Sequence, residues 1–444
     1  MVHAIVTRLL YTLLLLLVIA ATLPLWCYRY FNTTKYRGTL RQRLGHLPRS
    51  VQQQIENKSC CWIHAVSVGE VMAARPLIEA LHQTRPHWQM VVSTVTRTGQ
   101  QVVETQIPYA CHIFLPFDLP WTINRVVTLV RPRCLILLET ELWPNLIQAV
   151  AQQGTPVVVV NGRISQRSFR DYHRLRLAMR TLLAPVALLA MQSTANAERL
   201  RQLAPPRANI TVTGNLKFEQ ALRLPDQQTM QALWHRLPAA TGDLVWVAAS
   251  THPGEEELLL SCYRQLCRVF PTLRLILVPR HPERVPALQQ WLQQQGAVCQ
   301  LFSNSHGHWQ APIVLVDEIG WLQRLYGIAD VVFVGGSLVP HGGQNPLEPA
   351  AWGLVPLFGP HTHNFQEITT QLLTAQAAFQ VDDGNALYHQ LHTLLADPVQ
   401  RQQIGQRARQ LVEHNLGALE RTLAAMREVI PDLYPSPSGE GVGG

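Results

Sequence analysis

The stretch Trp62–Leu81, WIHAVSVGEVMAARPLIEAL, changes from an apolar run to a helical pattern within a few residues. Its first part is apolar, as in a buried strand, and its second part repeats apolar residues every three or four positions. Gly69 suits the turn between them because it has no Cβ. Pro76 allows two helix starts, near Glu70 with the proline tolerated inside, or at Pro76 after a short turn. The stretch therefore predicts a β-strand and an α-helix, with Glu70 where the strand ends.

The same alternation of strand and helix recurs along the chain. Alternating elements of this kind form parallel sheets with helices on both faces, and ligands bind at the carboxyl ends of the strands. We therefore expect an α/β fold with two doubly wound, Rossmann-like domains that face a cleft. The runs expected to be strands are Cys61–Val66, Met90–Thr96, His112–Phe117, Cys134–Glu139, Pro156–Asn161, Ala187–Gln192, Asn209–Gly214, Leu244–Ser250, Leu273–Pro279, Pro312–Asp317 and Asp330–Gly336.

The 444 residues are enough for two or three domains. A polar stretch with scattered prolines is expected to link the two halves. The tail PSPSGEGVGG has no core-forming residues and is expected to be disordered. The predicted parts are a membrane anchor (5–27), a basic segment (28–50), an N-terminal domain (51–217), a linker (218–242), a C-terminal domain (243–430) and a disordered tail (431–444).

The N-terminus combines an uncharged apolar run with a basic segment. Residues 9–26 carry no charge and are just long enough to span a bilayer. A signal peptide is the alternative, but no small-x-small cleavage site precedes the basic segment. Six Arg or Lys and no Asp or Glu lie between residues 28 and 50, so the positive-inside rule places the following domains in the cytoplasm. The same segment suits anionic phospholipid headgroups.

The composition favours anionic partners. The formal net charge is +8, which suits nucleic acid, phospholipid headgroups or a charged metabolite. The eight cysteines show neither a CxxC pair nor zinc-ligand spacing, and most lie in apolar runs. We interpret them as reduced core residues of a cytosolic protein.

Polar side chains stand at several predicted strand ends. Glu139 and Glu141 close an apolar strand, where a carboxylate is costly unless it is paired or used. Lys217 follows the last strand of the first half. Arg280 follows a strand of the second half, and a guanidinium suits a phosphate. The structural alternatives are a helix-start carboxylate for Glu70 and ordinary loop or turn residues for the others.

A glycine-rich stretch occupies residues 332–353, VFVGGSLVPHGGQNPLEPAAWG. Two glycine turns precede a helix that is expected to open at Pro346, and such turns can bind anions through backbone N–H groups. Glu348 would lie in the first helical turn, where it can accept the hydroxyls of a ribose. The chain contains no GxxxxGK[ST], HExxH or Asp-x-Asp motif, and the last absence argues against a metal-dependent nucleotide-sugar site.

Seven blocks together resemble the 3-deoxy-D-manno-octulosonic acid (Kdo) transferase family of lipopolysaccharide assembly. They are HAVSVGE, LETELWPN, GNLKFE, STHPGEEE, LVPRHPER, FVGGSL and GGQNPLEPAA, and the match runs in order to about Ile368. The resemblance implies a GT-B fold and an N-terminal anchor in the bacterial inner membrane, with the catalytic domains facing the cytoplasm. It also implies inverting transfer of Kdo from CMP-β-Kdo to lipid IVA, the lipid A precursor, with neither metal nor cofactor.

The resemblance also implies site residues. Glu70 is the expected general base, which takes a proton from the acceptor hydroxyl, and Glu139 and Lys217 are expected to support the transition state. Many members have a glutamate where this chain has Trp321, so a side-chain contact there would differ. The residues expected to contact CMP-Kdo are Pro279, Arg280, Ile319, Gly320, Trp321, Asn345, Pro346, Leu347 and Glu348.

Both substrates of such a reaction are anionic, which agrees with the basic composition. The resemblance implies CMP-Kdo, lipid IVA and an anionic phospholipid surface as partners, and no nucleic acid. The arginines between Arg29 and Arg49 are expected to hold the acceptor's phosphates. Two alternatives remain: an inner-face GT-B enzyme that uses a UDP-sugar, and a membrane-anchored scaffold with a dead site. Nucleotide selectivity separates the first, and intact Glu70, Arg280 and Glu348 speak against the second.

Overall fold

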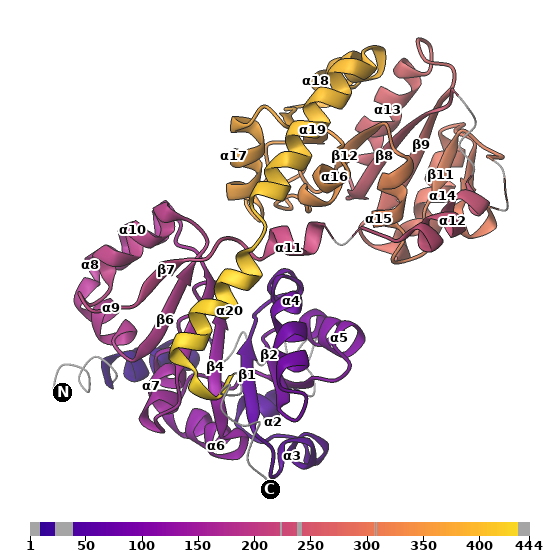
Figure 1. The fold of residues 1–444 in the computed structure, drawn as a ribbon. Helices are drawn as coiled ribbons and strands as arrows, with labels where there is room; N and C mark the ends of the chain where they lie inside the picture. The colour runs from indigo at the N-terminus through magenta and orange to yellow at the C-terminus, as the bar shows by residue number, and fades with distance from the viewer. Residues whose placement is uncertain are drawn as a thin grey trace, which may run out of the picture. The chain divides into compact units, whose positions relative to one another are not determined.

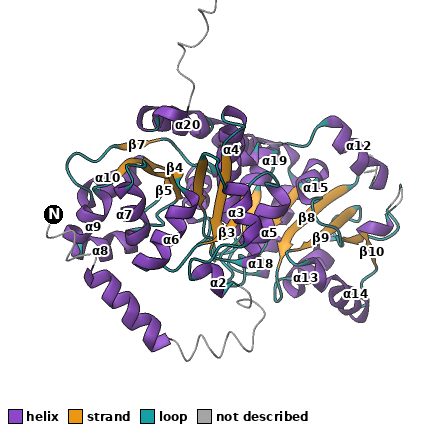
Figure 2. Ribbon diagram, turned by 90° about the horizontal axis from the view of Figure 1, so that it is seen from below, coloured by secondary structure: helices purple, strands orange, loops and turns teal. Residues whose placement is uncertain are grey.

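The computed structural model describes residues 9–433 except 23–38, 223, 238–241, 306 and 308. The chain divides into two compact units, one of residues 1–220 with 417–444 and one of residues 221–416 (Figure 1). In each unit helices surround the strands of a parallel sheet (Figure 2). The predicted α/β class with two Rossmann-like domains is therefore confirmed.

The sheet of the first unit has seven parallel strands in the order β3-β2-β1-β4-β5-β6-β7. Strands β2 and β3 follow one another on one side of β1, and β4 then lies on the other side of β1. Ligands of such sheets bind where the strand order reverses, which here is between β1 and β4. The strands are β1 (Cys60–His64), β2 (Gln89–Thr94), β3 (Cys111–Phe114), β4 (Pro132–Leu138), β5 (Val157–Gly162), β6 (Val186–Met191) and β7 (Ile210–Val212).

The second unit repeats this plan with the strand order β10-β11-β9-β8-β12-β13-β14. Its strand order reverses between β8 and β12, so their carboxyl ends mark the corresponding place for a ligand. The strands are β8 (Leu244–Thr251), β9 (Leu273–Pro279), β10 (Cys299–Leu301), β11 (Ile313–Leu315), β12 (Val331–Val334), β13 (Pro356–Phe358) and β14 (Phe379–Gln380).

Several helices begin at a side chain that accepts a hydrogen bond from the first turn, as at Thr96, Ser165, Asp226, Asp383 and Asp397. The α-helices of the first unit are α2 (Leu40–Arg43), α3 (Arg49–Ile55), α4 (Val68–Thr84), α5 (Arg97–Gln106), α6 (Pro120–Val130), α7 (Pro144–Gln152), α8 (Gln166–Arg174), α9 (Arg176–Leu183), α10 (Thr194–Leu203) and α20 (Ala418–Val429). Helix α11 (Lys217–Ala221) lies at the boundary between the units. The second unit contains α12 (Gln227–Arg236), α13 (Glu256–Leu266), α14 (Val285–Gln294), α15 (Leu322–Leu325), α16 (Leu347–Ala351), α17 (Gln366–Thr374), α18 (Gly384–Ala396) and α19 (Pro398–His414). Four short 3₁₀ helices are also described: η1 (Pro282–Arg284), η2 (Phe302–Asn304), η3 (Tyr326–Ile328) and η4 (Pro431–Leu433).

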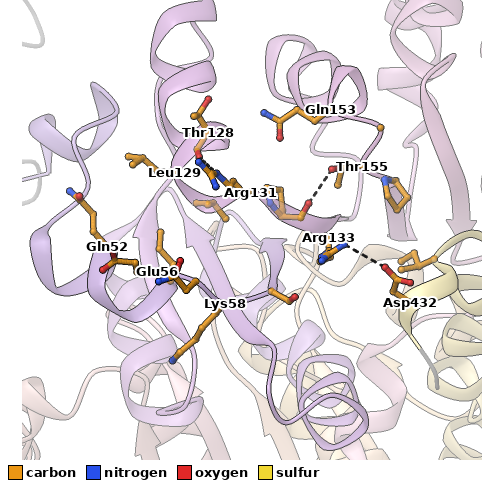
Figure 3. A pocket seen from close by; sticks show the side chains of 18 residues that line it. Gln52, Glu56, Lys58, Thr128, Leu129, Arg131, Arg133, Gln153, Thr155 and Asp432 are labelled. Atoms are coloured by element: carbon orange, nitrogen blue, oxygen red, sulfur yellow. Dashed lines mark hydrogen bonds and ion pairs between the residues drawn. The ribbon is translucent and has the colours of Figure 1, made fainter. Parts of the chain in front are cut away.

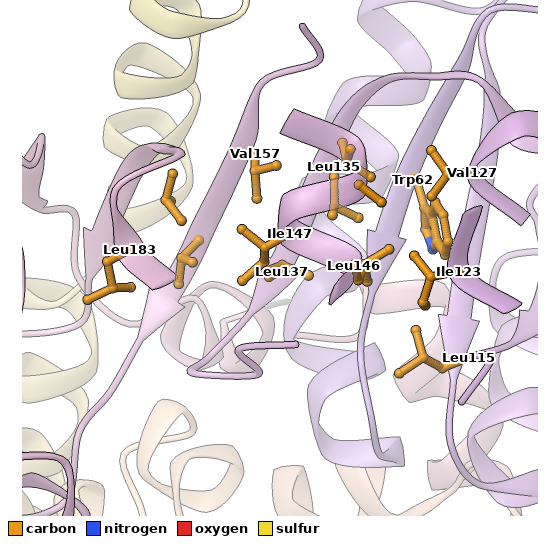
Figure 4. Close-up of a cluster of buried hydrophobic side chains, with 14 of the residues drawn as sticks. Trp62, Leu115, Ile123, Val127, Leu135, Leu137, Leu146, Ile147, Val157 and Leu183 are labelled. Carbon is orange, nitrogen blue, oxygen red and sulfur yellow. The ribbon is translucent and has the colours of Figure 1, made fainter. Parts of the chain in front are cut away.

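The sheet of the first unit is buried on both faces. On one face Trp62 and Leu135 of the central strands pack against Ile123 of α6 and Ile147 of α7 (Figure 4). Strand β5 is buried at every position, which explains why its sequence is a continuous valine run and not an alternating one. The seven cysteines in the described residues are free, as predicted, while Cys27 lies outside those residues.

The domain boundary differs from the sequence prediction at the C-terminus. We expected the second domain to continue to residue 430, but α20 belongs to the first unit. Met426 and Ile430 enter the core on the second face of its sheet, and Arg421 donates to the Thr213 carbonyl over 2.9 Å. The predicted tail also begins later than expected, because η4 is ordered and Leu433 is fully buried. Residues 434–444 lie outside the described residues.

The predicted membrane anchor is only partly covered by the structure. Residues 9–22 are helical, whereas residues 1–8 and 23–38 lie outside the described residues. Within the described part of the chain, no helix combines the length and apolar character needed to cross a membrane. The Asn145 amide donates to Thr12 over 3.4 Å, so helix 9–22 contacts the start of α7.

One arginine of the basic segment has a structural role. Arg43 is 7% exposed, donates to the hydroxyl of Thr39 and the carbonyl of Val95, and stacks over Phe114. We expected the basic segment as a whole to face phosphates, and for Arg43 that expectation is wrong, because its guanidinium satisfies groups inside the unit. Arg41 and Arg49 are exposed.

Gly405 of α19 allows a close crossing of the chain in the second unit. A Cβ on Gly405 would stand 1.8 Å from the Gly353 carbonyl oxygen. Glycine-to-alanine changes inside a helix normally stabilise, but here we expect Gly405→Ala to destabilise by about 1–3 kcal/mol because the new methyl group overpacks the contact. Urea unfolding of the full chain measures the effect. Gly384→Ala in α18 is the control, because its nearest neighbour would be 3.5 Å away, and equal stability of the two variants would contradict the prediction.

Candidate active site

Glu70 lies at the switch point of the first unit, in the first turn of α4. The helix begins at Val68 and continues through Pro76, so the earlier of the two helix starts is confirmed. The Glu70 Oε2 accepts a hydrogen bond from the Val66 N–H at 2.8 Å, and Oε1 accepts from the Ser67 hydroxyl at 3.1 Å. The carboxylate thus binds the segment that leads into α4, at the N-cap residue Ser67 and at Val66 before it. Glu70 is more than a structural residue, because the pKa of its carboxyl is strongly shifted.

The environment of Glu70 raises the pKa of its carboxyl to about 7. Burial is the main cause, and the negative charges of Glu139 and Glu141 add to it, while the bonds from Val66 and Ser67 act in the opposite direction. Burial and Glu139 also raise the pKa of Glu141. A carboxyl group with a pKa near the working pH can exchange a proton efficiently, which is what general acid–base chemistry requires.

Glu139 stands between two cations next to this carboxyl. Its Oε1 is 3.1 Å from the Lys217 Nζ, and its Oε2 is 3.4 Å from the Arg163 Nε. Glu139 and Lys217 are each 15% exposed, so solvent screens this pair less than a surface ion pair. Glu139 also has a positive φ of 54°, which is unusual for a residue with a side chain and is often found at functional sites.

The topology explains why these residues meet. Glu70 follows β1 and Glu139 follows β4, and the two strands are neighbours, with His64 opposite Leu137. Lys217 enters from the end of the first unit, where the Asn161 side chain accepts from the Leu216 N–H at 3.0 Å. The structure therefore brings together the three predicted residues Glu70, Glu139 and Lys217.

Sequence reasoning missed Arg163 and Asn161, although both stand at the end of β5. Asn161 is fully buried with a positive φ of 55°. The signal that could have identified them was the pair of polar residues that follows a run of four valines in VVVVNGR. A buried asparagine there needs hydrogen-bond partners, and an arginine next to it lies at the same sheet edge as Glu139.

In the second unit Arg280 and Glu348 come close together. Arg280 follows Pro279, the last residue of β9, and is exposed. Asn345 donates to the Glu348 Oε1 over 3.1 Å, and its side-chain oxygen accepts from the Leu347 N–H at 3.1 Å. Burial raises the pKa of Glu348, while Asn345 and the positive charge of Arg280 lower it. Arg280 thus supplies a cation, and Glu348 and Asn345 supply hydrogen-bonding groups, at the carboxyl end of the sheet.

The other residues predicted to bind the nucleotide differ in their exposure and in their contacts with neighbouring side chains. Pro346 precedes α16 and Leu347 is fully buried, so the leucine side chain is unavailable to a ligand. Ile319 is 86% exposed and Gly320 has a φ of 91°. The Trp321 ring lies 4.8 Å from the Arg236 guanidinium and 4.4 Å from that of Arg324, and 4.9 Å from the Phe302 ring.

The first glycine turn does not present its backbone N–H groups to a ligand. The fully buried Glu255 carboxylate accepts hydrogen bonds from the N–H groups of Gly336, Ser337 and Leu338 at 2.7–3.0 Å. We expected the glycine turns to bind an external anion, and for this turn that expectation is wrong because a side chain of the protein supplies the anion.

A surface hollow of about 1070 Å³ lies away from these residues, at the opposite edge of the first sheet (Figure 3). Residues that precede β1, β4 and β5 line it, and cations such as Lys58 and Arg133 alternate there with Glu56 and Asp432. Arg133 and Asp432 form an exposed ion pair at 3.8 Å. None of the predicted site residues lines this hollow.

Comparison with known proteins gives a consistent result. Residues 38–220 match the family model described as 3-deoxy-D-manno-octulosonic-acid transferase (kdotransferase). The 3-deoxy-D-manno-octulosonic acid transferase of Haemophilus influenzae is 35% identical, with 89% of this chain and 92% of the relative covered. The enzyme of the same name from Bordetella pertussis is 34% identical over 83% of this chain and 86% of the relative.

Solved structures agree on the fold. A UDP-GlcNAc 2-epimerase from Neisseria meningitidis has a TM-score of 0.57 at 14% identity, covering 84% of this chain and 100% of that chain. A glycosyltransferase from Rickettsia africae has a TM-score of 0.54 at 12% identity, covering 85% of this chain and 100% of that chain. At such identities the likeness concerns the fold alone.

Proposed function

The chain belongs to the Kdo transferase family, and we propose that it transfers Kdo from CMP-β-Kdo to lipid IVA with inversion at the anomeric carbon. The observation that carries the proposal is Glu70, a carboxyl group with a pKa of about 7 at the switch point of the first unit, beside Glu139 and Lys217. A sugar hydroxyl is a poor nucleophile near neutral pH, and Glu70 accepts its proton as the new bond forms.

The proposed reaction is a single displacement. The acceptor oxygen attacks the anomeric carbon of Kdo while the bond to the CMP phosphate breaks, so the β-linked donor becomes an α-ketoside. Lys217 balances the charge of Glu139 beside the base and stabilises charge that develops during transfer. We propose that the second unit holds CMP, with Arg280 at the phosphate and Glu348 at the ribose, and that neither a metal ion nor a cofactor takes part.

We also propose that the enzyme works at the cytoplasmic face of the bacterial inner membrane, held there by its N-terminal segment. Leucines of helix 9–22 support this, for example Leu9 at 64% and Leu17 at 60% exposed. The corner between α8 and α9 also supports it. Leu175 and Leu177 are 63% and 72% exposed there and alternate with two exposed arginines, which suits an anionic lipid surface.

The raised pKa of Glu70 predicts the pH profile of transfer. The base must be ionised in the free enzyme, so kcat/KM is expected to rise with pH through about 7 and to level off above it. Glu139→Gln removes one of the negative charges that raise this pKa, so the inflection should move to lower pH. Rates measured across the pH range for both proteins check the prediction. Glu79→Gln on the same helix is the control, and an unmoved inflection in Glu139→Gln would contradict it.

The function itself is tested by giving the detergent-solubilised full chain lipid IVA and freshly generated CMP-Kdo. Mass spectrometry of the lipid should show a mass increase that corresponds to added Kdo. CMP should compete with the donor and UDP should not. A folded wild-type protein that leaves the lipid unchanged would overturn the proposal, and inhibition by UDP would favour a UDP-sugar donor.

A further inference from the structure

Three histidines meet beside Arg280 in the second unit. His252 follows β8, His281 follows β9, and His341 lies in the loop after β12. The rings of His252 and His341 are stacked with their centres 4.3 Å apart and an angle of 20° between their planes. The His281 ring meets His252 edge-on at 5.8 Å. We call these three residues the histidine cluster; the reaction proposed above gives it no role.

A buried carboxylate holds the cluster in place. Besides binding the turn after β12, Glu255 accepts a hydrogen bond from the backbone N–H of His252 at 2.9 Å. One side chain thus joins the segment that carries His252 to the loop that leads to His341. Gly336 makes the approach possible, because a Cβ there would lie 3.1 Å from the His252 ring. Gln344 is also 3.3 Å from the His252 Nε2, which further orients the ring.

The cluster lies in a positively charged environment. His252 is 7% exposed, and its pKa is lowered to about 4 by burial and then by His341, His281, Arg280 and Arg284. The nearby acidic groups are engaged elsewhere or exposed. Glu255 binds backbone N–H groups, Glu256 binds Arg284 at 3.0 Å and Thr251 at 3.0 Å, and Glu283 is an exposed partner of His281 at 3.4 Å. An anion that entered here would therefore meet several hydrogen-bond donors, and of these three carboxylates only the exposed Glu283 contacts a ring of the cluster.

We infer that the histidine cluster receives the carboxylate of the sugar acid in the donor, beside the phosphate site at Arg280. The inference rests on the proposed function. In a CMP-activated 2-keto sugar acid, one anomeric carbon carries both the phosphodiester oxygen and the carboxylate. A site for such a donor therefore needs two adjacent sets of hydrogen-bond donors. The nucleotide derivative of an ordinary aldose has a hydrogen at the position of the carboxylate, so the cluster would select for sugar acids.

The test compares donor and nucleotide binding in three variants of the full chain, His252→Asn, His281→Asn and His341→Asn. The KM for freshly generated CMP-Kdo should rise about tenfold, because each variant loses a hydrogen bond to a charged group. The Ki for CMP, which lacks the sugar carboxylate, should stay within about twofold of wild type. His389→Asn, an exposed histidine on α18, is the matched control and should change neither constant.

The outcomes separate the inference from the proposed function. His281 is exposed, so its variant is expected to fold even if the loss of buried His252 destabilises the protein. An unchanged donor KM in folded His281→Asn and His341→Asn would overturn the inference while Kdo transfer stands. A parallel rise of the donor KM and the CMP Ki would also overturn it, since the cluster would then serve the nucleotide. Absence of Kdo transfer by the wild-type enzyme would overturn the proposed function, and the inference with it.

Discussion

Glu70→Gln is expected to lower the rate of Kdo transfer by about 10²–10⁴-fold, the usual contribution of a positioned general base. The amide cannot accept the hydroxyl proton. Its oxygen can still accept the hydrogen bond that Val66 donates at 2.8 Å, so the start of α4 is preserved. The loss should therefore appear in kcat, with the donor KM within about twofold of wild type.

Stability provides a second measurement for the same variant. The folded-state pKa of about 7 lies above the ordinary value of 4.5, so the ionised carboxylate opposes folding as the pH rises through this interval. Glu70→Gln should then be at least as stable as wild type at pH 8, as measured by urea unfolding. Glu79→Gln, which changes a carboxylate on the same helix that pairs with Arg75, should leave the rate unaltered. Transfer at near wild-type rate by Glu70→Gln would show that another group is the base.

Lys217→Met is expected to lower kcat by about 10²–10³-fold, as the removal of a preorganised charge from an active site commonly does. Methionine has a similar length but no charge. Glu139 would lose the cation at 3.1 Å and keep Arg163 at 3.4 Å, so its negative charge beside Glu70 would be less well balanced. The measurement is the transfer rate under donor saturation, together with the pH profile, which should shift upward because Glu139 would raise the Glu70 pKa further.

Two further variants test whether the loss of transfer in Lys217→Met is specific to its pairing with Glu139. Lys58→Met removes an exposed lysine at the opposite edge of the same sheet and should have no effect on transfer. The double variant Glu139→Gln/Lys217→Met should lose less than the product of the two single losses, because the residues form one ion pair. A fully active Lys217→Met enzyme would remove the lysine from the mechanism.

The sequence alone was sufficient for the fold class and for most strands, because their signals are local. The prediction for Leu273–Pro279 matches β9 at both ends, and the valine run of β5 is a strand as expected. Strands β10, β13 and β14 were missed. They have two or three residues, and unlike the equally short β7 and β11 they do not lie inside any of the longer runs expected to be strands. The family blocks likewise identified Glu70, Glu139 and Lys217 as candidate site residues, since each block is a short continuous stretch of sequence.

Contacts between distant parts of the chain could only be found in the tertiary structure. Nothing local in α20 indicates that it returns to the first unit, where Arg421 binds the Thr213 carbonyl. From sequence alone, the glycine pair in FVGGSL predicts a ligand-binding loop. Only the folded chain shows that Glu255 binds this turn instead. The sequence predicts that Arg43 is a surface charge, yet the residue is buried.

The chemistry proposed for the site depends both on the local sequence and on the tertiary structure. The sequence determined that a carboxylate follows β1, because a strand and a helix start are encoded by neighbouring residues, although Gly69 lies within α4 and not in the expected turn. It could not determine that this carboxylate has a pKa near 7, because that value arises from burial and from Glu139, which is brought alongside by the pairing of β1 with β4. Local patterns specify elements, whereas desolvation and charge coupling depend on distances that exist only after the sheet has formed.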